Sequence, residues 1–358
     1  MSDSEVRMPS WMSGVALGEG LVDSIAQHHE DRLRRKGASE LVRVVLGQEV
    51  NENRLPESSS DELWFESMLA SACMVGAAKL WRRTRVVYDV NPDFGASLID
   101  MEVDAEFPGE VLKQLPHPDP VFVFREPHIR TMPSGEDIAV RGFLVTCRPA
   151  VNSVASTMDV DLDDDETPYL VVMIVDVLPK SGKAKSRGFV ELKVPRQEGK
   201  TTAEKIVGDI GIFYGTHNGY RPPADEGALK AFLSEMALIA VSHMLYACCD
   251  NPDAQEASAP AQATRVKKGS RPKRPTRVLR LGWHLGPAIR RFNAGIERLR
   301  RTGASTGWTV IPHVRRGHPH TVLYGAAKAF SKVKWFPPTL VNADRFGDEA
   351  EGLLVPFE

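Results

Sequence analysis

The spacing of hydrophobic positions changes along the chain and predicts several kinds of segment. Apolar residues recur at helical spacing among the charges of residues 22–46, and more densely along 63–75, where Ser60 or Asp61 can cap a helix ending near Arg85. From about residue 86 the apolar residues gather in short β-branched and aromatic runs bounded by Pro, Gly and Asp, the pattern typical of strands. The predicted strands are residues 86–90, 121–124, 138–147, 169–177 and 188–194.

Helical spacing returns after the predicted sheet. Residues 228–249 form a predicted helix with one apolar face, made by Phe232, Met236, Ile239, His243 and Tyr246. Residues 250–276 are rich in Ala, Pro, Ser and Lys and have no apolar period, which indicates a linker. A strand over 278–283, a helix opening at Gly286-Pro287, and strands over 308–324 and 331–335 then predict a β-α-β-β unit.

These patterns predict an α+β fold. We expect a helical N-terminal region over residues 1–85, a central mixed or antiparallel sheet with a closing helix over 86–249, a flexible linker over 250–276, and a small basic C-terminal domain over 277–358.

The charge is strongly divided along the chain. Between Arg265 and Arg345 there are 19 Lys and Arg against two Asp and Glu, a net charge of +17, whereas the rest carries −19. The acidic part could neutralise the basic part within one fold or across a homodimer. The alternative is that the basic part contacts a polyanion such as RNA or the ribosome.

Other bulk features narrow the class of protein. No apolar run approaches the ~18 residues needed to span a bilayer, and the acidic start has no signal-peptide pattern, so we expect a cytoplasmic protein without a membrane partner. The four cysteines include no Cys-x-x-Cys pair, which favours reduced thiols and argues against a cysteine zinc site. We expect no metal and no cofactor.

The densest chemistry is a cluster of three histidines and two arginines: His313, Arg315, Arg316, His318 and His320. A metal site usually needs a carboxylate ligand as well, and acidic residues are almost absent from this part. Imidazole and guanidinium groups can instead supply the acid, base and cation of a metal-independent ribonuclease. Non-catalytic RNA binding and plain packing between strands are the alternatives. All three histidines would converge only if a bulge at Gly317 reset the strand register.

Further residues are candidates for binding. The RNA or ribosome contacts would come from a basic run, a helix and a strand: Arg271, Lys273, Arg274, Arg290, Arg291, Lys332, Lys334 and Trp335. The alternatives are a solvated linker for the run and a core position for the tryptophan. An open edge of the central sheet could take an extended peptide near Phe122, Phe124 and Phe143, although an ordinary sheet core is the simpler explanation for any single ring.

The C-terminal third resembles a known family. Residues 310–320, the Lys334–Pro338 element, Val341-Asn342, and the turn from Gly282-Trp283 to Gly286 and Arg290 are similar to the signature of a phage- and plasmid-encoded anti-CRISPR family. That family acts against biogenesis of the type V-A CRISPR effector nuclease. The match is strongest over residues 277–342. Pro319 stands where the family has an aromatic residue, and Ile311 where it has arginine.

The resemblance implies a protein that lowers the amount of its target. Such a protein would recognise the nascent N-terminal peptide of the target during translation, and loss of the mRNA would follow. The implied partners are a nascent polypeptide and the mRNA or ribosome. The identity of the target, and whether nuclease activity is intrinsic or recruited, stay open. A toxin-like ribonuclease or a general RNA- or ribosome-binding protein is the alternative.

Overall fold

The structure is a computed structural model. It describes residues 10–36, 38–39, 41–45, 62–99, 107–146, 169–178, 186–194, 200–201, 226–257, 275–302, 313–315, 318–326, 330–336 and 339–341. Its helices are α1 (Ser10–Arg35), α2 (Leu41–Val45), α3 (Glu62–Thr84), α4 (Pro92–Ile99), α7 (Glu226–Ala247) and α8 (Leu285–Thr302), with a 3-10 turn η2 (Gly109–Gln114).

The main sheet has seven strands in the order β6-β5-β4-β3-β1-β9-β8. They are β1 (Val86–Val90), β3 (Val121–Thr131), β4 (Asp137–Thr146), β5 (Tyr169–Leu178), β6 (Ser186–Val194), β8 (Ala254–Glu256) and β9 (Arg277–Leu281). β1 pairs parallel with β3 on one side and with β9 on the other, whereas β3, β4, β5 and β6 form an antiparallel meander. The expected α+β fold with a mixed sheet is thus confirmed.

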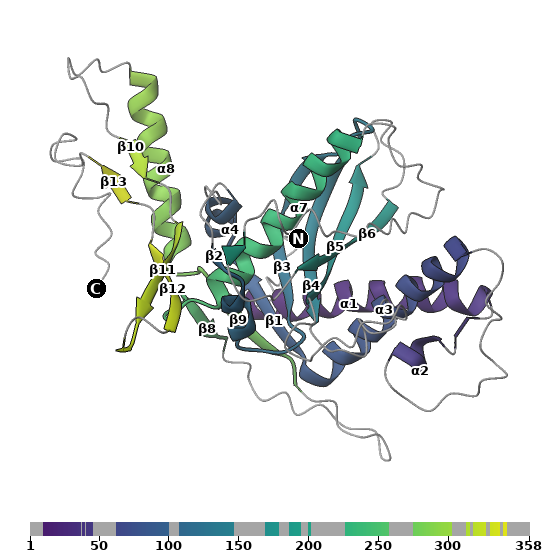
Figure 1. The fold of residues 1–358 in the computed structure, drawn as a ribbon. Helices are drawn as coiled ribbons and strands as arrows, with labels where there is room; N and C mark the ends of the chain where they lie inside the picture. Colours follow the sequence, from purple (N-terminus) through teal and green to yellow (C-terminus); the bar gives the residue numbers. More distant parts are fainter. Residues whose placement is uncertain are drawn as a thin grey trace, which may run out of the picture.

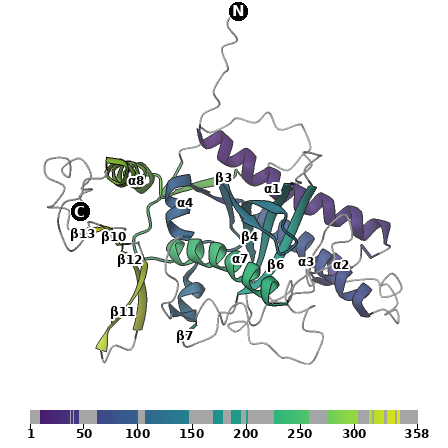
Figure 2. The same cartoon turned by 90° about the horizontal axis from the view of Figure 1, so that it is seen from above.

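Helices cover both faces of this sheet. Alternate residues of each strand face opposite sides: Tyr88 and Phe122 join a core that includes α7 and α4, while Val87 and Val121 join a second core with α1 and α3. Figures 1 and 2 show α7 and α1 on opposite sides of the strands. The central strands are buried at consecutive positions, over 86–90, 121–124 and 169–176, because both faces of the sheet are covered there.

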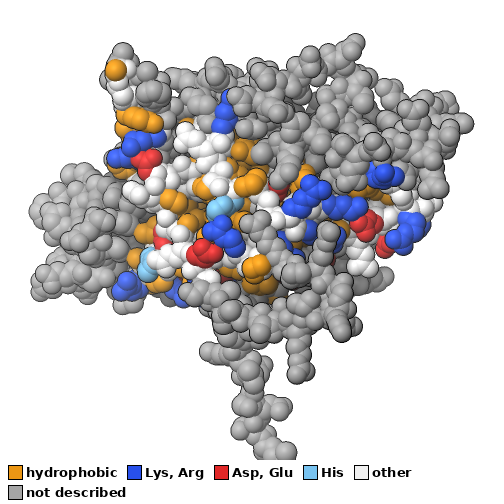
Figure 3. Space-filling view, turned by 90° about the horizontal axis from the view of Figure 1, so that it is seen from below, with side chains coloured by type: hydrophobic (Ala, Val, Ile, Leu, Met, Phe, Trp, Pro, Cys, Tyr) orange, Lys and Arg blue, Asp and Glu red, His pale blue; other side chains and the backbone are white. Residues whose placement is uncertain are grey.

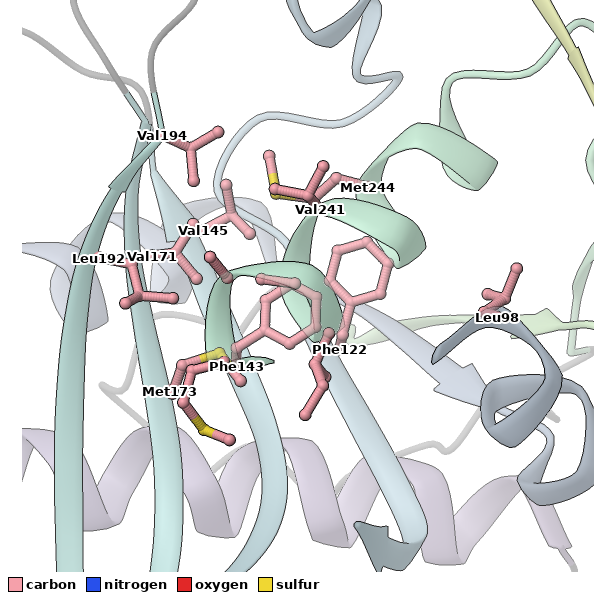
Figure 4. Packing of buried hydrophobic residues seen from close by; sticks show 14 of the residues in the cluster. Leu98, Phe122, Phe143, Val145, Val171, Met173, Leu192, Val194, Val241 and Met244 are labelled. Carbon is pink, nitrogen blue, oxygen red and sulfur yellow. The ribbon is translucent and has the colours of Figure 1, made fainter. Parts of the chain in front are cut away.

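Three phenylalanines lie at the centre of the core under α7. Phe122 stacks on Phe143 with ring centroids 4.6 Å apart, and Phe124 lies 6.0 Å from Phe143. Figure 4 shows Phe122 and Phe143 pointing towards the helix among Val145, Val171 and Met244. Phe122 and Phe143 are fully buried and Phe124 is 3% exposed. The prediction that these rings contact a peptide is therefore corrected, because no side-chain surface is left for one.

Most elements predicted from the hydrophobic pattern occur within a few residues of their expected bounds, including β1, β5, β6, α3 and α7. Among the described residues, α7 alone is long and apolar enough to cross a membrane, and its burial against the sheet identifies it as a core helix. The pattern missed α4 and β8.

The first strand of the expected C-terminal domain belongs to the main sheet. β9 pairs along its full length with β1, from Val86↔Arg277 to Val90↔Leu281. β8, which falls inside the expected linker, pairs antiparallel with β9. This placement corrects the expected start of a separate unit at residue 277; residues 258–274 lie outside the described part.

The remaining strands form short two-stranded ribbons. β11 (His318–Tyr324) pairs with β12 (Phe330–Phe336), β10 (His313–Arg315) pairs with β13 (Thr339–Val341), and β2 (Phe107–Pro108) pairs with β7 (Lys200–Thr201). Both views show β10 to β13 and α8 to one side of the main sheet.

Candidate functional site: the carboxyl ends of the parallel strands

The site lies where the three parallel strands end. The chain leaves β1 after Val90 and enters α4, and it leaves β9 after Leu281 and enters α8. Ligands of open sheets with parallel strands commonly bind at these carboxyl ends, where loops and helix starts come together.

Two glycines make the tight turn from β9 into α8. Gly282 has a φ of 72°, a left-handed conformation that favours glycine, and a side chain there would overlap the ring of Phe94 on α4. A side chain at Gly286 would overlap the amide of Asn91. The two glycines thus let α8 start against α4, and a residue with a side chain would not fit at either position.

An aspartate outside the turn caps α8. The Asp253 carboxylate accepts hydrogen bonds from the backbone N–H groups of His284 and Leu285, at 2.7 and 3.1 Å. The carbonyl oxygen of Asp253 accepts a third, from the N–H of Gly282. These bonds satisfy donors at the helix start and tie it to the segment before β8.

Trp283 sits between two arginines. The guanidinium carbon of Arg125, from β3, lies 4.7 Å from the indole centroid, and that of Arg280, from β9, lies 5.3 Å away. The indole N–H donates to the backbone carbonyl of Asp89 at 2.9 Å. Side chains from three neighbouring strands and the following turn therefore form one cluster, stabilised by cation–π contacts.

A buried ion pair holds one of these arginines. Both carboxylate oxygens of Asp89 accept hydrogen bonds from Arg125, the Nε bond being 2.8 Å long. The Asp89 side chain is fully buried, whereas that of Arg125 is 21% exposed. Gly14 of α1 lies over the carboxylate, since a side chain there would meet Asp89 Oδ2 at 3.0 Å. The pair links the sheet, α1 and the tryptophan.

Two predicted binding residues lie on the first turns of α8. Arg290 donates from Nε to the Asp93 carboxylate of α4 at 2.8 Å, and this hydrogen bond raises the pKa of Arg290. Arg291 is exposed. Arg290 therefore has a structural partner, while Arg291 remains a candidate contact.

The structure divides the histidine cluster between two ribbons. His313 pairs with Val341, whereas His318 and His320 pair with Phe336 and Lys334. Two residues separate β10 from β11, and two separate β12 from β13, so both ribbons share the same register. Gly317 lies outside the described residues, so the bulge that would bring all three histidines together stays a prediction.

The described side chains of β11 and β12 are largely exposed. His320 is exposed, and its ring meets that of Phe336 edge-on at 5.4 Å. Lys334 is also exposed, while Lys332 forms an ion pair of 2.7 Å with Asp250 at the end of α7. Of the other candidates, His313, Arg315, His318 and Trp335 are placed by backbone register alone. Arg271, Lys273, Arg274 and Arg316 lie outside the described residues.

A second histidine pair lies in the core and was missed from the sequence. His243 Nδ1 donates to the Ile239 carbonyl at 2.7 Å, and its ring centroid is 6.3 Å from that of His128. A side chain at Gly95 would meet both Nε2 atoms, at 3.4 and 3.7 Å. Burial lowers the pKa of His243 to about 4 and that of His128 to about 3, so both rings are neutral at physiological pH. His243 itself was predicted as a core residue, which its burial confirms. His128 could not be singled out from the sequence, because it comes close to His243 only in the folded protein.

The described surface is not uniformly basic. On the face shown in Figure 3, Lys and Arg side chains stand beside Asp and Glu, with hydrophobic groups between them. Among the ion pairs of the described residues are Arg277 with Glu256 and Arg290 with Asp93. Within the described ranges, no three His, Cys, Asp or Glu side chains gather as metal ligands would.

Fold and site together define a three-layer α+β protein with an arginine-flanked tryptophan at the carboxyl edge of its parallel strands. The family model described as AcrVA2-like, anti-CRISPR type V subtype A2, matches residues 88–343. The crystal structure of AcrVA2 matches with 13% sequence identity and a TM-score of 0.44, over 93% of this chain and 98% of that one. No curated protein matches. Because the family model covers most of the chain, the protein belongs to the AcrVA2-like anti-CRISPR family.

Membership of this family confirms the resemblance found in the sequence. The structure shows what several of the signature residues do. Gly282, Trp283 and Gly286 build the turn that joins β9 to α8, and Arg290 joins α8 to α4.

Proposed function

We propose that this anti-CRISPR protein recognises the nascent N-terminal peptide of a target protein and lowers its expression by promoting loss of the mRNA during translation. Its membership of the anti-CRISPR family, over residues 88–343, is the observation that carries the proposal. The expected partners are the emerging peptide and the mRNA or ribosome.

An edge of the main sheet supports peptide recognition. Within the described residues β6 pairs with β5 alone, over nine consecutive positions from Tyr169↔Val194 to Val177↔Ser186. A long edge strand offers backbone donors and acceptors to an extended segment, and a nascent chain just leaving the ribosome is extended and unfolded. We propose that the peptide adds to β6, instead of contacting the buried phenylalanines.

The basic C-terminal part supports contact with the message or ribosome. Its net charge of +17 would attract RNA, and Arg291 and Lys334 expose their side chains there. Since β9 of this part is paired with β1, peptide binding on the sheet and RNA binding on the ribbons would occur on one connected framework.

The alternative, a metal-independent ribonuclease, has less support. That chemistry needs an acid, a base and a cation around one phosphate. His313 lies in the β10–β13 pair, apart from the β11–β12 ribbon that carries His318 and His320. Under the proposed function, by contrast, the part that carries His318 and His320 acts on the message and the sheet binds the peptide. Replacing both histidines with Ala should therefore leave peptide binding intact and abolish the lowering of expression.

A recoded reporter tests the proposal. The N-terminal coding segment of the effector nuclease is fused to a reporter in three forms: native, recoded with synonymous codons, and shifted in frame by compensating single-nucleotide changes. The synonymous form changes the RNA and keeps the peptide, whereas the shifted form keeps nearly all of the RNA and changes the peptide.

Co-expression of the full-length protein should lower the mRNA of the native and synonymous reporters and spare the shifted one. The reverse pattern, in which the shifted reporter falls and the synonymous one survives, would mean that RNA sequence is recognised. Equal loss of all three would favour a general ribonuclease.

A further inference from the structure

One face of the β11–β12 ribbon combines exposed rings with cations. Directly opposite residues of an antiparallel pair share a face, and His320 lies opposite Lys334 while Val322 lies opposite Lys332. The face, called here the ribbon face, consists of the described side chains His320, Val322, Tyr324, Lys332, Lys334 and Phe336.

The rings of the ribbon face are unusually open to solvent for their size. Tyr324 is 47% and Phe336 is 45% exposed. Each meets a neighbour diagonally across the ribbon: the Lys332 ammonium lies 5.2 Å from the Tyr324 ring, and the His320 ring lies 5.4 Å from that of Phe336. These contacts hold the rings in place and leave much of their surface uncovered.

The two exposed rings lie at the ends of the ribbon face, and the basic groups lie between them. Tyr324 and Phe336 lie at opposite ends of the paired segment, six residues apart along β11, which corresponds to about 20 Å. Lys332, Lys334 and His320 lie between them, and the ribbon face carries no acidic residue of its own. Asp250, at the end of α7, pairs with Lys332, whereas Lys334 is exposed.

We propose that the ribbon face binds an unpaired strand of RNA, with bases stacked on Tyr324 and Phe336 and a phosphate near Lys334. This inference rests on the proposed function, which places a message beside the protein. Rings interleaved with cations suit single-stranded nucleic acid, because each base offers a flat surface and each linkage a negative charge. Bases in a duplex are already stacked and cannot reach the rings.

A protein partner is the competing occupant. It would be held by apolar contact and would accept any hydrophobic side chain of similar size, whereas base stacking needs the π system. Leucine in place of each ring therefore separates the two. Leu323, which is 54% exposed and lies one position from Tyr324 on the opposite face of β11, provides a matched control.

The probe is a short fluorescent oligouridine, compared with a duplex RNA of equal length, and anisotropy is measured with the full-length protein over a series of salt concentrations. The unpaired probe should bind at least about tenfold more tightly than the duplex. Tyr324→Leu and Phe336→Leu should each weaken binding about tenfold, in line with the loss of one stacked base, while Leu323→Ala should bind like the parent.

Lys334→Gln gives an independent signature. Removing one phosphate contact should reduce the slope of log affinity against log salt by about 0.7, the value for one neutralised phosphate on a single strand. Tyr324→Leu should weaken binding without changing this slope.

Several results would overturn the inference. They are absence of binding to the unpaired probe, equal binding of the duplex, or full affinity in both leucine variants. Loss of binding in Leu323→Ala to the same extent would also overturn it, because the opposite face would then matter equally. If Phe336→Leu loses RNA binding but the native reporter is not lowered even by the parent protein, the ribbon face stands and the proposed function fails.

Discussion

At the scale of single residues, the most informative side chains are polar groups buried within the apolar cores. Asp89 is fully buried in β1, bound to Arg125, and its backbone carbonyl holds Trp283. His243 is buried among phenylalanines under α7. The burial of His243 could be predicted from its apolar helical face, but the partners of Asp89 and His243 could not, because they are set only once the strands and helices are packed.

Breaking the buried ion pair should be costly. Asp89→Asn keeps the shape of the side chain but leaves Arg125 without its counter-charge, so the free energy of unfolding should fall by about 3 kcal/mol or more. The matched control is Asp23→Asn, which breaks the exposed pair with Arg82, with side chains 66% and 41% exposed. Its effect should stay below about 1 kcal/mol. Urea denaturation measures both, and equal effects would contradict the structural role of Asp89.

The core histidine should make stability fall in acid. The pKa of His243 drops from 6.5 in the unfolded chain to about 4 in the folded protein, so protons bind the unfolded chain more readily. Its contribution is complete above pH 6.5 and is lost as the pH falls towards 4. Between pH 7 and pH 5 this amounts to about 2 kcal/mol.

His243→Met removes the titrating ring and should reduce the loss of stability between pH 7 and pH 5 by that amount. Ser242→Ala, a buried neighbour that does not titrate, is the control. It should shift stability equally at both pH values. An unchanged pH dependence in His243→Met would show that other groups dominate acid unfolding.

At the scale of elements, the spacing of hydrophobic residues was enough to locate helices and strands along the chain, but not to give the order of the strands in the sheet. The sequence predicts β1, β5, α3 and α7 closely, since long apolar runs and helical faces are local signals. It does not reveal that β9 adds to β1 across nearly 200 residues, because pairing partners are set by packing far along the chain. α4 is eight residues long, too short for its period to be distinct.

The turn from β9 into α8 should not tolerate side chains. Gly282→Ala or Gly286→Ala would drive a methyl group into Phe94 or Asn91 and should lower the free energy of unfolding by about 1–3 kcal/mol. Gly20→Ala, in α1 with open space around it, should raise stability by about 0.5–1 kcal/mol. Thermal unfolding of the three variants measures this, and a neutral Gly286→Ala would contradict the close approach of α8 to α4.

The edge strand should respond to the peptide. If the N-terminal peptide of the target adds to β6, amide hydrogen exchange over Ser186–Val194 should slow when that peptide is supplied to the full-length protein. A scrambled peptide of the same composition is the control. β8, at the other edge of the sheet, should exchange as before. Protection at β8 alone would place the peptide elsewhere.

At the scale of the whole molecule, one sheet joins parts that the sequence suggested were separate. The charge division of +17 and −19 is visible from composition, but the ion pairs that neutralise Arg277, Arg290 and Lys332 are visible only in the structure. The family signature could be recognised in the sequence because its residues are grouped in short segments, which form one compact turn and two ribbons.

The most direct test of the central claim is to purify the full-length protein from actively translating cells, and to sequence the bound RNA and identify the bound peptides by mass spectrometry. The account predicts one strongly enriched message together with the N-terminal peptide that it encodes, both lost when puromycin releases nascent chains. Broad RNA without any enriched peptide, unaffected by puromycin, would contradict nascent-chain recognition and leave a general RNA-binding protein.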